Sequence, residues 1–218
     1  MNKPVILFDL DGTLIDSTEA ILESFQVAFK SFGTEVPPVD DIKREIGHTL
    51  ENMFLTLGVD QKKVKAYVNA YKMHYRVISC EKTILLEGAR EAVIEASKFA
   101  TLGVVTTKTG EYSTILLEHM GLMSYFKVLI GREHVKNPKP DAEPILKALQ
   151  ILKRDVNSVW MIGDTPMDIL SAKSAKVNDI AVTSGYGSAR ELEKYASKVC
   201  NNALGAVKFI KNSDENYK

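Results

Sequence analysis

The sequence predicts an α/β protein with a parallel, doubly wound (Rossmann-like) sheet and an all-helical cap inserted after the first strand. Short runs rich in valine and isoleucine alternate with segments of helical spacing over most of the chain, which is typical of a parallel sheet covered by helices. One stretch near the N-terminus interrupts this alternation with successive helical patterns. Of the 218 residues, 45% are hydrophobic and 26% are charged, so the chain can bury such a core.

Five apolar runs bounded by polar or turn residues are the expected strands. The first is Val5–Phe8, and the others span 102–105, 128–130, 159–162 and 180–182. Apolar residues at helical spacing lie between the later runs, for example over 89–96 and 145–152. Strand and helix therefore alternate, and we assign residues 1–15 and 81–218 to the α/β core.

Residues 16–80 form the expected cap, because they contain amphipathic helices and no convincing strand. Apolar stripes run over 21–32, 50–57 and 64–71, and the first two end at Gly33 and Gly58. A helical block placed after the first strand would lie over the carboxyl edge of the sheet.

The charge balance and the cysteines exclude several classes of protein. Lys and Arg together number 28, as do Asp and Glu, so no overall field favours nucleic acid or an anionic membrane as a partner. Cys80 and Cys200 are far apart in the sequence, which argues against a zinc site or a disulfide framework. No run approaches the ~20 apolar residues of a membrane span. We expect a cytoplasmic protein; the sequence indicates no oligomeric state.

The strongest candidate site follows the first strand, where Asp9 and Asp11 stand two residues apart and Gly12 permits a sharp turn. Ligands of open parallel sheets bind beyond the carboxyl ends of the strands. Other expected strands lead into further polar residues: Thr106, Thr107, Lys139, Asp164 and Asp168. Any one of these aspartates alone is as well explained as a helix cap or turn residue. Together they form an acidic cluster that needs a cation, and all-oxygen ligands favour Mg²⁺.

These residues resemble the motifs of the haloacid-dehalogenase-like superfamily of phosphohydrolases. The segment 9–13 (DLDGT) is similar to its first motif, and the other three motifs are matched by Thr106, Lys139, and Gly163-Asp164 with Asp168. The resemblance covers nearly the whole chain, including a helical cap between the first and second motifs. Segments 9–17, 105–108, 139–141 and 163–165 most resemble the phosphoglycolate phosphatase group. Thr107 and Ala142 depart from it, since asparagine and proline are common at those positions.

The resemblance implies a phosphatase that forms an aspartyl-phosphate. Asp9 would be the nucleophile, and Asp11 would serve as general acid and then general base. Mg²⁺ would be held by Asp9, the backbone carbonyl of Asp11 and Asp164, with support from Asp168. The Thr106 hydroxyl, the Thr107 amide and Lys139 would bind the phosphoryl group, because phosphoryl transfer depends mainly on positioning and electrostatics.

The small phosphorylated metabolite predicted as substrate is 2-phosphoglycolate, with the cap setting the choice. By resemblance, Gly47 and His48 help to form the substrate pocket, although a glycine C-cap before a helix explains the same residues. Arg44 or His48 would suit an anionic leaving group. An inorganic pyrophosphatase, a nucleotidase and a sugar-phosphate mutase share this scaffold, and the absence of an arginine- and serine-rich cap loop favours hydrolysis over a mutase.

A receiver-like signalling module is the alternative from a different class. It also uses a phosphorylated aspartate, Mg²⁺, a threonine and a lysine on a parallel sheet. Its acidic pair and its phospho-acceptor lie on different strands, however, and its chain is shorter and lacks a helical insertion. The spacing of Asp9 and Asp11 therefore opposes this alternative.

Overall fold

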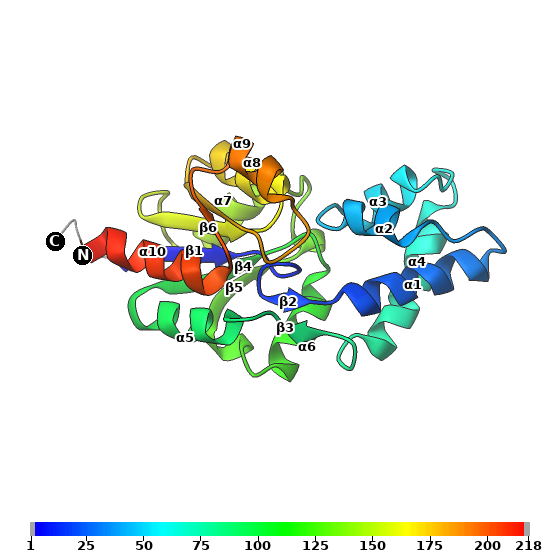
Figure 1. Cartoon of the computed structure of the whole chain (residues 1–218), viewed down its shortest axis with the longest axis horizontal. Coiled ribbons are helices and arrows are strands. Elements are labelled where there is room, and N and C mark those ends of the chain that lie inside the picture. The colour runs from blue at the N-terminus through cyan, green and yellow to red at the C-terminus, as the bar shows by residue number, and fades with distance from the viewer. Residues whose placement is uncertain (1–2, 216–218) are drawn as a thin grey trace.

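A six-stranded sheet forms the centre of the protein, as seen in a computed structural model that describes residues 3–215 (Figure 1). Residues 1–2 and 216–218, which the prediction assigns to the core, lie outside the described residues. All neighbouring strands of this sheet are parallel. In spatial order the strands are β5 (Phe126–Ile130), β4 (Thr101–Val105), β1 (Val5–Phe8), β6 (Val159–Gly163), β7 (Asn178–Val182) and β8 (Val199–Cys200). The predicted parallel α/β class is confirmed.

Helices cover both faces of the sheet, because successive side chains of the central strand point to opposite faces. Ile6 and Phe8 pack in one hydrophobic cluster with α5 (Ala89–Phe99), α6 (Gly110–His119) and α10 (Ala203–Glu215). Val5 and Leu7 pack in another with α7 (Glu143–Leu152) and α8 (Pro166–Ser174). The shorter α9 (Ala189–Tyr195) adds Leu192 to a small cluster beside α8 and β7. The 3₁₀ turns Met123–Tyr125 and Arg132–His134 complete this part of the chain.

Four helices form a separate lobe at one end of the molecule: α1 (Thr18–Ser31), α2 (Val39–Glu45), α3 (Leu50–Thr56) and α4 (Val64–Ile78). This lobe, which we call the cap, has its own core of aromatic rings. Phe54, for example, contacts Phe25, Phe29, Tyr67 and Tyr71 at ring-centroid distances of 4.6–6.3 Å. Tyr112 of α6 adds a further ring to this cluster and so joins the cap to the α/β core.

The chain enters and leaves the cap through two adjacent segments, β2 (Ile15–Asp16) and β3 (Ile84–Leu85), which pair antiparallel. The Leu86 amide also donates to the Leu14 carbonyl at 3.0 Å. Both connections therefore lie at one place beside the carboxyl end of β1.

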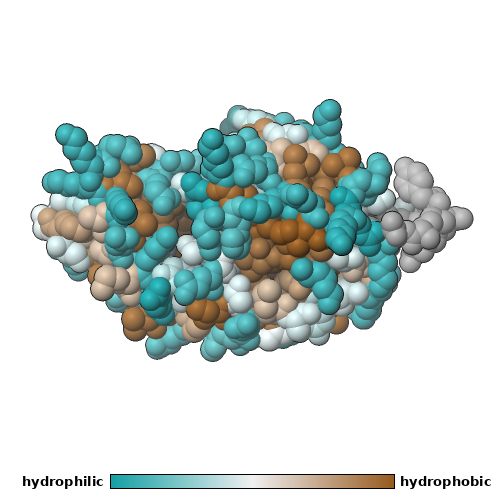
Figure 2. All heavy atoms as spheres, turned by 180° about the vertical axis from the view of Figure 1, so that it is seen from behind, coloured by the Kyte–Doolittle hydropathy of each residue, from teal (hydrophilic) through white to brown (hydrophobic). Residues whose placement is uncertain are grey.

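One face of the molecule is mostly hydrophilic (Figure 2), and both cysteines are free thiols. Hydrophilic side chains cover most of the face shown in Figure 2, and an apolar area lies over the α/β core. Between residues 3 and 215, no helix has both the length and the hydropathy needed to cross a membrane. Cys80 and Cys200 are free thiols, each half-buried.

Candidate active site

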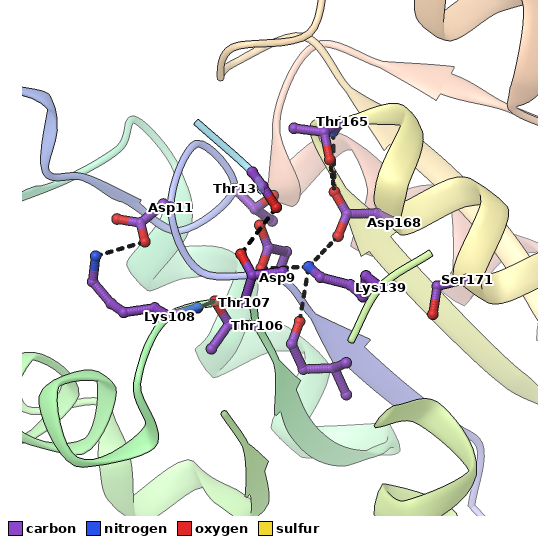
Figure 3. Close-up of polar contacts among 12 residues, drawn as sticks. Asp9, Asp11, Thr13, Thr106, Thr107, Lys108, Lys139, Thr165, Asp168 and Ser171 are labelled. Carbon is purple, nitrogen blue, oxygen red and sulfur yellow. Dashed lines mark hydrogen bonds and ion pairs between the residues drawn. The ribbon is translucent and has the colours of Figure 1, made fainter. Parts of the chain in front are cut away.

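The central strand delivers Asp9 to the carboxyl edge of the sheet. All four residues of β1 are buried, and the Asp9 amide extends the ladder by donating to the Ile162 carbonyl at 2.8 Å. The Asp9 carboxylate is itself buried, and its Oδ1 accepts a hydrogen bond from Lys139 Nζ at 2.8 Å. Lys139 also donates to the Val105 carbonyl at 3.2 Å and to Asp168 Oδ1 (Figure 3).

Three carboxylates gather around this lysine. Oxygen atoms of Asp9, Asp164 and Asp168 lie within 4.8 Å of one another, and all three side chains are buried. Burial raises the pKa of Asp9 to about 7, against the attraction of Lys139. Burial, together with the charges of Asp9 and Asp168, also raises the pKa of Asp164 well above its ordinary value.

The charge of this cluster is not balanced by the protein. Lys139 pairs with Asp9 and Asp168, and within the described residues no other cation forms an ion pair with any of the three carboxylates. The remaining oxygens of the cluster are suited to a hard divalent cation, which prefers carboxylate ligands. The residues present therefore fit a bound metal ion.

Short-range contacts hold Asp164 in place. Its Oδ1 accepts from the Thr13 hydroxyl at 3.2 Å, and its Oδ2 accepts from the Tyr186 amide at 2.8 Å. Gly12 makes this approach possible: its φ is +82°, and a Cβ atom there would lie 2.2 Å from Asp164 Oδ2. Any side chain at position 12 would push against the acidic cluster.

Asp11 has partners different from those of Asp9. Its Oδ2 pairs with Lys108 Nζ at 2.8 Å, and its Oδ1 accepts from the Ser17 hydroxyl. Burial disfavours the charged form of Lys108, yet Asp11 and the nearby tyrosines hold its pKa well above the ordinary value. The two carboxylates of the DLDGT segment are therefore paired with two different lysines, as Figure 3 shows.

The two threonines that follow β4 make different contacts. Thr106 is buried, and its Oγ1 accepts from the Lys108 amide at 3.2 Å. This bond leaves the hydroxyl proton of Thr106 available for a ligand. The Thr107 hydroxyl donates to the Gly47 carbonyl at 3.0 Å, so it joins the core to the cap.

The cap closes one side of a small cavity of about 60 Å³ above Asp9 and Asp11. Gly47 and His48, the residues predicted for a substrate pocket, border this cavity. Arg44 lies outside it: the side chain is exposed and pairs with Asp41 on its own helix. Of the two groups expected to suit an anionic leaving group, only His48 is therefore beside the cavity. Apolar and aromatic side chains make up much of the wall: Ile21, Ile46, Leu50, Met53, Tyr71, Tyr75 and Tyr112.

The structure brings the predicted site residues to one edge of the sheet, in two groups. Asp9, Lys139, Asp164 and Asp168 form the buried cluster. Asp11, Thr106 and Thr107 border the cavity together with the cap residues Gly47 and His48. The Asp11 side chain contacts Lys108 rather than this cluster, and its predicted metal ligand is its backbone carbonyl.

Sequence reasoning missed two further residues of the site. Lys108 follows Thr106 and Thr107 in the same strand-end segment, and this position was a signal that it too reaches the edge of the sheet. Tyr75 lies on α4 of the cap, beyond the apolar stripe predicted over 64–71, and Lys108 Nζ lies 4.7 Å from the centroid of its ring.

Comparison with known proteins supplies further information. The sequence profile of the haloacid dehalogenase-like hydrolases matches residues 6–182. The protein named "Probable phosphatase IndB" of Dickeya dadantii is 34% identical, over 94% of this chain and 92% of its own length. A pyrophosphatase PpaX of Listeria monocytogenes is 36% identical, over 78% of this chain and 79% of its own. A phosphoglycolate phosphatase of Aquifex aeolicus is 31% identical, over 84% and 85%.

Solved structures show the same arrangement of sheet and cap. A hydrolase of the haloacid dehalogenase-like family from Streptococcus pneumoniae superposes with a TM-score of 0.85 and is 26% identical. The match covers 95% of this chain and 98% of that protein. The likeness therefore extends over the cap as well as the core.

Proposed function

The chain belongs to the haloacid dehalogenase-like hydrolase family and is a phosphoric monoester hydrolase, and we propose that it converts 2-phosphoglycolate to glycolate and phosphate with the help of Mg²⁺. The observation that carries this proposal is the separate pairing of Asp9 and Asp11. Two neighbouring carboxylates in different environments are suited to two different roles in one reaction.

Asp9 is the nucleophile of the proposed reaction. Its Oδ1 is held by Lys139, which leaves Oδ2 to attack phosphorus. As the new P–O bond forms, the bond from phosphorus to the ester oxygen breaks, and Asp11 gives its proton to the departing oxygen. Asp11 then takes a proton from water, which attacks the aspartyl-phosphate. Phosphate leaves, and the Asp9 carboxylate is restored.

The phosphoryl oxygens are bound by groups already fixed at the edge of the sheet. The Thr106 hydroxyl proton is free to be donated, because its Oγ1 accepts from the Lys108 amide. The Thr107 amide supplies a further hydrogen-bond donor, and the Lys139 ammonium supplies positive charge. Such preorganised donors are the main source of catalysis in phosphoryl transfer.

We assign the Mg²⁺ site to the carboxylates of Asp9 and Asp164 with the backbone carbonyl of Asp11. When bound, the ion supplies charge that stabilises the transferring phosphoryl group. Asp168 has a supporting role in this proposal. Its Oδ1 accepts from Lys139, and its Oδ2 accepts from the Thr165 amide at 3.0 Å and the Thr165 hydroxyl at 2.7 Å. Asp168, at the start of α8, therefore positions the Lys139 side chain.

The size of the cavity favours a small leaving group. Drug-sized and nucleotide-sized ligands occupy pockets of roughly 300 Å³ or more, whereas the space here is about 60 Å³. A two-carbon acid fits this limit better than a nucleoside. Inorganic pyrophosphate is also small, and its hydrolysis is the competing proposal, because the pyrophosphatase of L. monocytogenes is similar over most of its length.

The test is phosphate release from a panel containing 2-phosphoglycolate, pyrophosphate, a nucleoside monophosphate and β-glucose 1-phosphate, measured with Mg²⁺ and with a chelator. We expect the highest kcat/KM for 2-phosphoglycolate and no turnover with chelator. Preference for pyrophosphate would replace the substrate while keeping the mechanism. Stable phosphate on one aspartate, without release, would support the receiver-like alternative instead.

Replacement of the nucleophile tests the chemistry independently of the substrate. An Asp9→Asn protein should fold and show no turnover of any member of the panel. Metal-dependent activity in this variant would contradict the assignment of Asp9.

A further inference from the structure

Lys108 is a largely shielded cation that the reaction described above does not use. Its side chain is 10% exposed, and that of its partner Asp11 is 12% exposed. The Nζ atom lies 2.8 Å from Asp11 Oδ2 and 4.7 Å from the centre of the Tyr75 ring. An ammonium group over an aromatic face is stabilised without losing its capacity to bind an anion.

The place of this cation follows from the role of Asp11. In the proposed reaction Asp11 protonates the ester oxygen, so the leaving group must lie against the Asp11 carboxylate. A cation that pairs with the same carboxylate and also borders the cavity is then close to atoms one or two bonds beyond the ester oxygen. Lys108 pairs with Asp11 and lines the cavity.

The other charges near the cavity show why a cation is needed there. Asp9 and Asp11 both border the cavity and would repel a second anion on the substrate. Lys139 is paired with Asp9 and Asp168, and in the proposed reaction it binds the phosphoryl group rather than the leaving group. Lys72, Arg132 and His48 also border the cavity, but within the described residues none of them forms an ion pair with Asp11.

We propose that Lys108 binds a second anionic group of the substrate, attached close to the ester oxygen, and thereby selects phosphate esters whose leaving group carries a carboxylate or a phosphate. This inference rests on the proposed function and narrows its substrate class. It applies to 2-phosphoglycolate, an ester, and equally to pyrophosphate, an anhydride in which the bridging oxygen takes the place of the ester oxygen and leaves as part of the second phosphate.

A second feature of the same wall supports the assignment. The Tyr75 hydroxyl is buried and has no hydrogen-bond partner among residues 3–215. Buried polar groups are normally paired, and an orphaned one costs stability. Tyr75 borders the cavity and its ring faces Lys108 Nζ, so the residue that bears this unpaired hydroxyl belongs to the same wall as the proposed anion site.

The experiment compares two substrates that differ only in the second anion. 2-Phosphoglycolate carries a carboxylate, and 2-hydroxyethyl phosphate carries a hydroxymethyl group in its place; both leave as alkyl alcohols that need protonation. In wild type, kcat/KM should be higher for 2-phosphoglycolate. In Lys108→Met the ratio of the two values should fall about ten- to a hundredfold, the effect of losing one charge-assisted hydrogen bond. Pyrophosphate, measured alongside, shows which of the two anions the wild type prefers.

Inhibition by product gives a second readout. Glycolate should inhibit turnover of 2-hydroxyethyl phosphate in wild type and should lose most of this inhibition in Lys108→Met and Lys108→Gln. The matched control is Lys127→Met at the start of β5, an exposed lysine at the opposite edge of the sheet, which should leave both measurements unchanged.

Two results would separate failure of this inference from failure of the proposed function. An equal loss of kcat/KM for both substrates in the Lys108 variants would mean that Lys108 acts only through Asp11, and would overturn the inference while the phosphatase activity stands. Absence of turnover by wild type on every phosphate ester would overturn the proposed function itself. Residual activity of the variants on 2-hydroxyethyl phosphate shows that their active sites are folded.

Discussion

Lys139 Nζ lies 2.8 Å from Asp9 Oδ1, and both side chains are almost completely excluded from solvent. The pair joins two segments that are 130 residues apart in the sequence, the end of β1 and the loop before α7. Removing two charges from water is costly, and the cost is recovered only when geometry and further hydrogen bonds are favourable. Here the lysine also donates to Asp168 and to the Val105 carbonyl, so the group proposed to bind the phosphoryl group also joins three parts of the fold.

Loss of this lysine should therefore reduce stability as well as activity. Lys139→Met leaves Asp9 and Asp168 buried without their cation, and we expect the free energy of unfolding to fall by about 3–5 kcal/mol. Urea unfolding followed by circular dichroism measures the change, with Lys127→Met as the exposed control. A decrease no larger than that of the control would show that the buried pair does not stabilise the fold.

Gly12 is required for two reasons, its positive φ and its close approach to Asp164, and a comparison with Gly33 separates their effects on stability. A Cβ at Gly12 would collide with the Asp164 carboxylate, whereas Gly33, which also has positive φ, has nothing within 4 Å of such an atom. Gly33→Ala should cost about 1–2 kcal/mol from backbone strain alone. Gly12→Ala should cost more and should also abolish phosphate release. Equal unfolding energies for the two variants, with activity retained, would contradict the reading of Gly12 as a packing constraint.

Mg²⁺ should stabilise the folded chain. Because ligand that binds only the folded state raises stability by mass action, a concentration 100-fold above Kd should add about 2.7 kcal/mol and raise Tm measurably. Asp164→Asn removes one of the proposed ligands and should abolish most of the rise. Thermal unfolding with and without Mg²⁺ gives the answer, and a Tm that is the same in both conditions for wild type would oppose a metal site at this cluster.

We expect the Glu133 carboxylate to make a pH-dependent contribution to the free energy of unfolding. It accepts from the Gly110 amide at 2.9 Å, at the N-terminus of α6. Burial alone would raise the pKa of Glu133, but this hydrogen bond holds it below the ordinary value of 4.5. Its stabilising effect is therefore complete above pH 4.5 and is lost as the pH falls through the lowered pKa.

Glu133→Gln should accordingly destabilise the protein by about 0.5 kcal/mol at neutral pH, since the group is partly exposed and screened by solvent. At a pH below the lowered pKa, wild type and variant should unfold alike. Urea unfolding across this pH range tests the sign, and a gap that widens on acidification would contradict it.

The strands of the core could be predicted because most are buried on both faces and read as continuous apolar runs. Val5–Phe8 matches β1 residue for residue. Strands β5 and β7 begin two residues earlier than expected, because their first two residues include polar Lys127, Asn178 and Asp179. The edge strand β8 was missed: it has two half-buried residues and therefore no pattern. The short helix α2 was also missed, because only Ile42 of its seven residues is buried.

The site could be predicted where its residues lie at strand ends, because parallel strands bring their carboxyl ends to one edge. Contacts between cap and core could not be predicted in the same way. The pairing of Lys108 with Asp11, its position over Tyr75, and the outward direction of Arg44 depend on how α2 and α4 dock, and no local pattern encodes that docking. The contacts that the cap makes with the core, which bear on substrate choice, are therefore the part of the candidate site that the sequence predicts least.

The paired segments β2 and β3 have an evolutionary consequence. Because the segments that leave the core and return to it lie side by side, the helical cap is an insertion with both ends at one place in the core. A longer, shorter or different cap at this place would leave the order of the six parallel strands unchanged. Descendants of such a chain could thus differ in the cap while keeping the strand-end residues of the candidate active site unaltered.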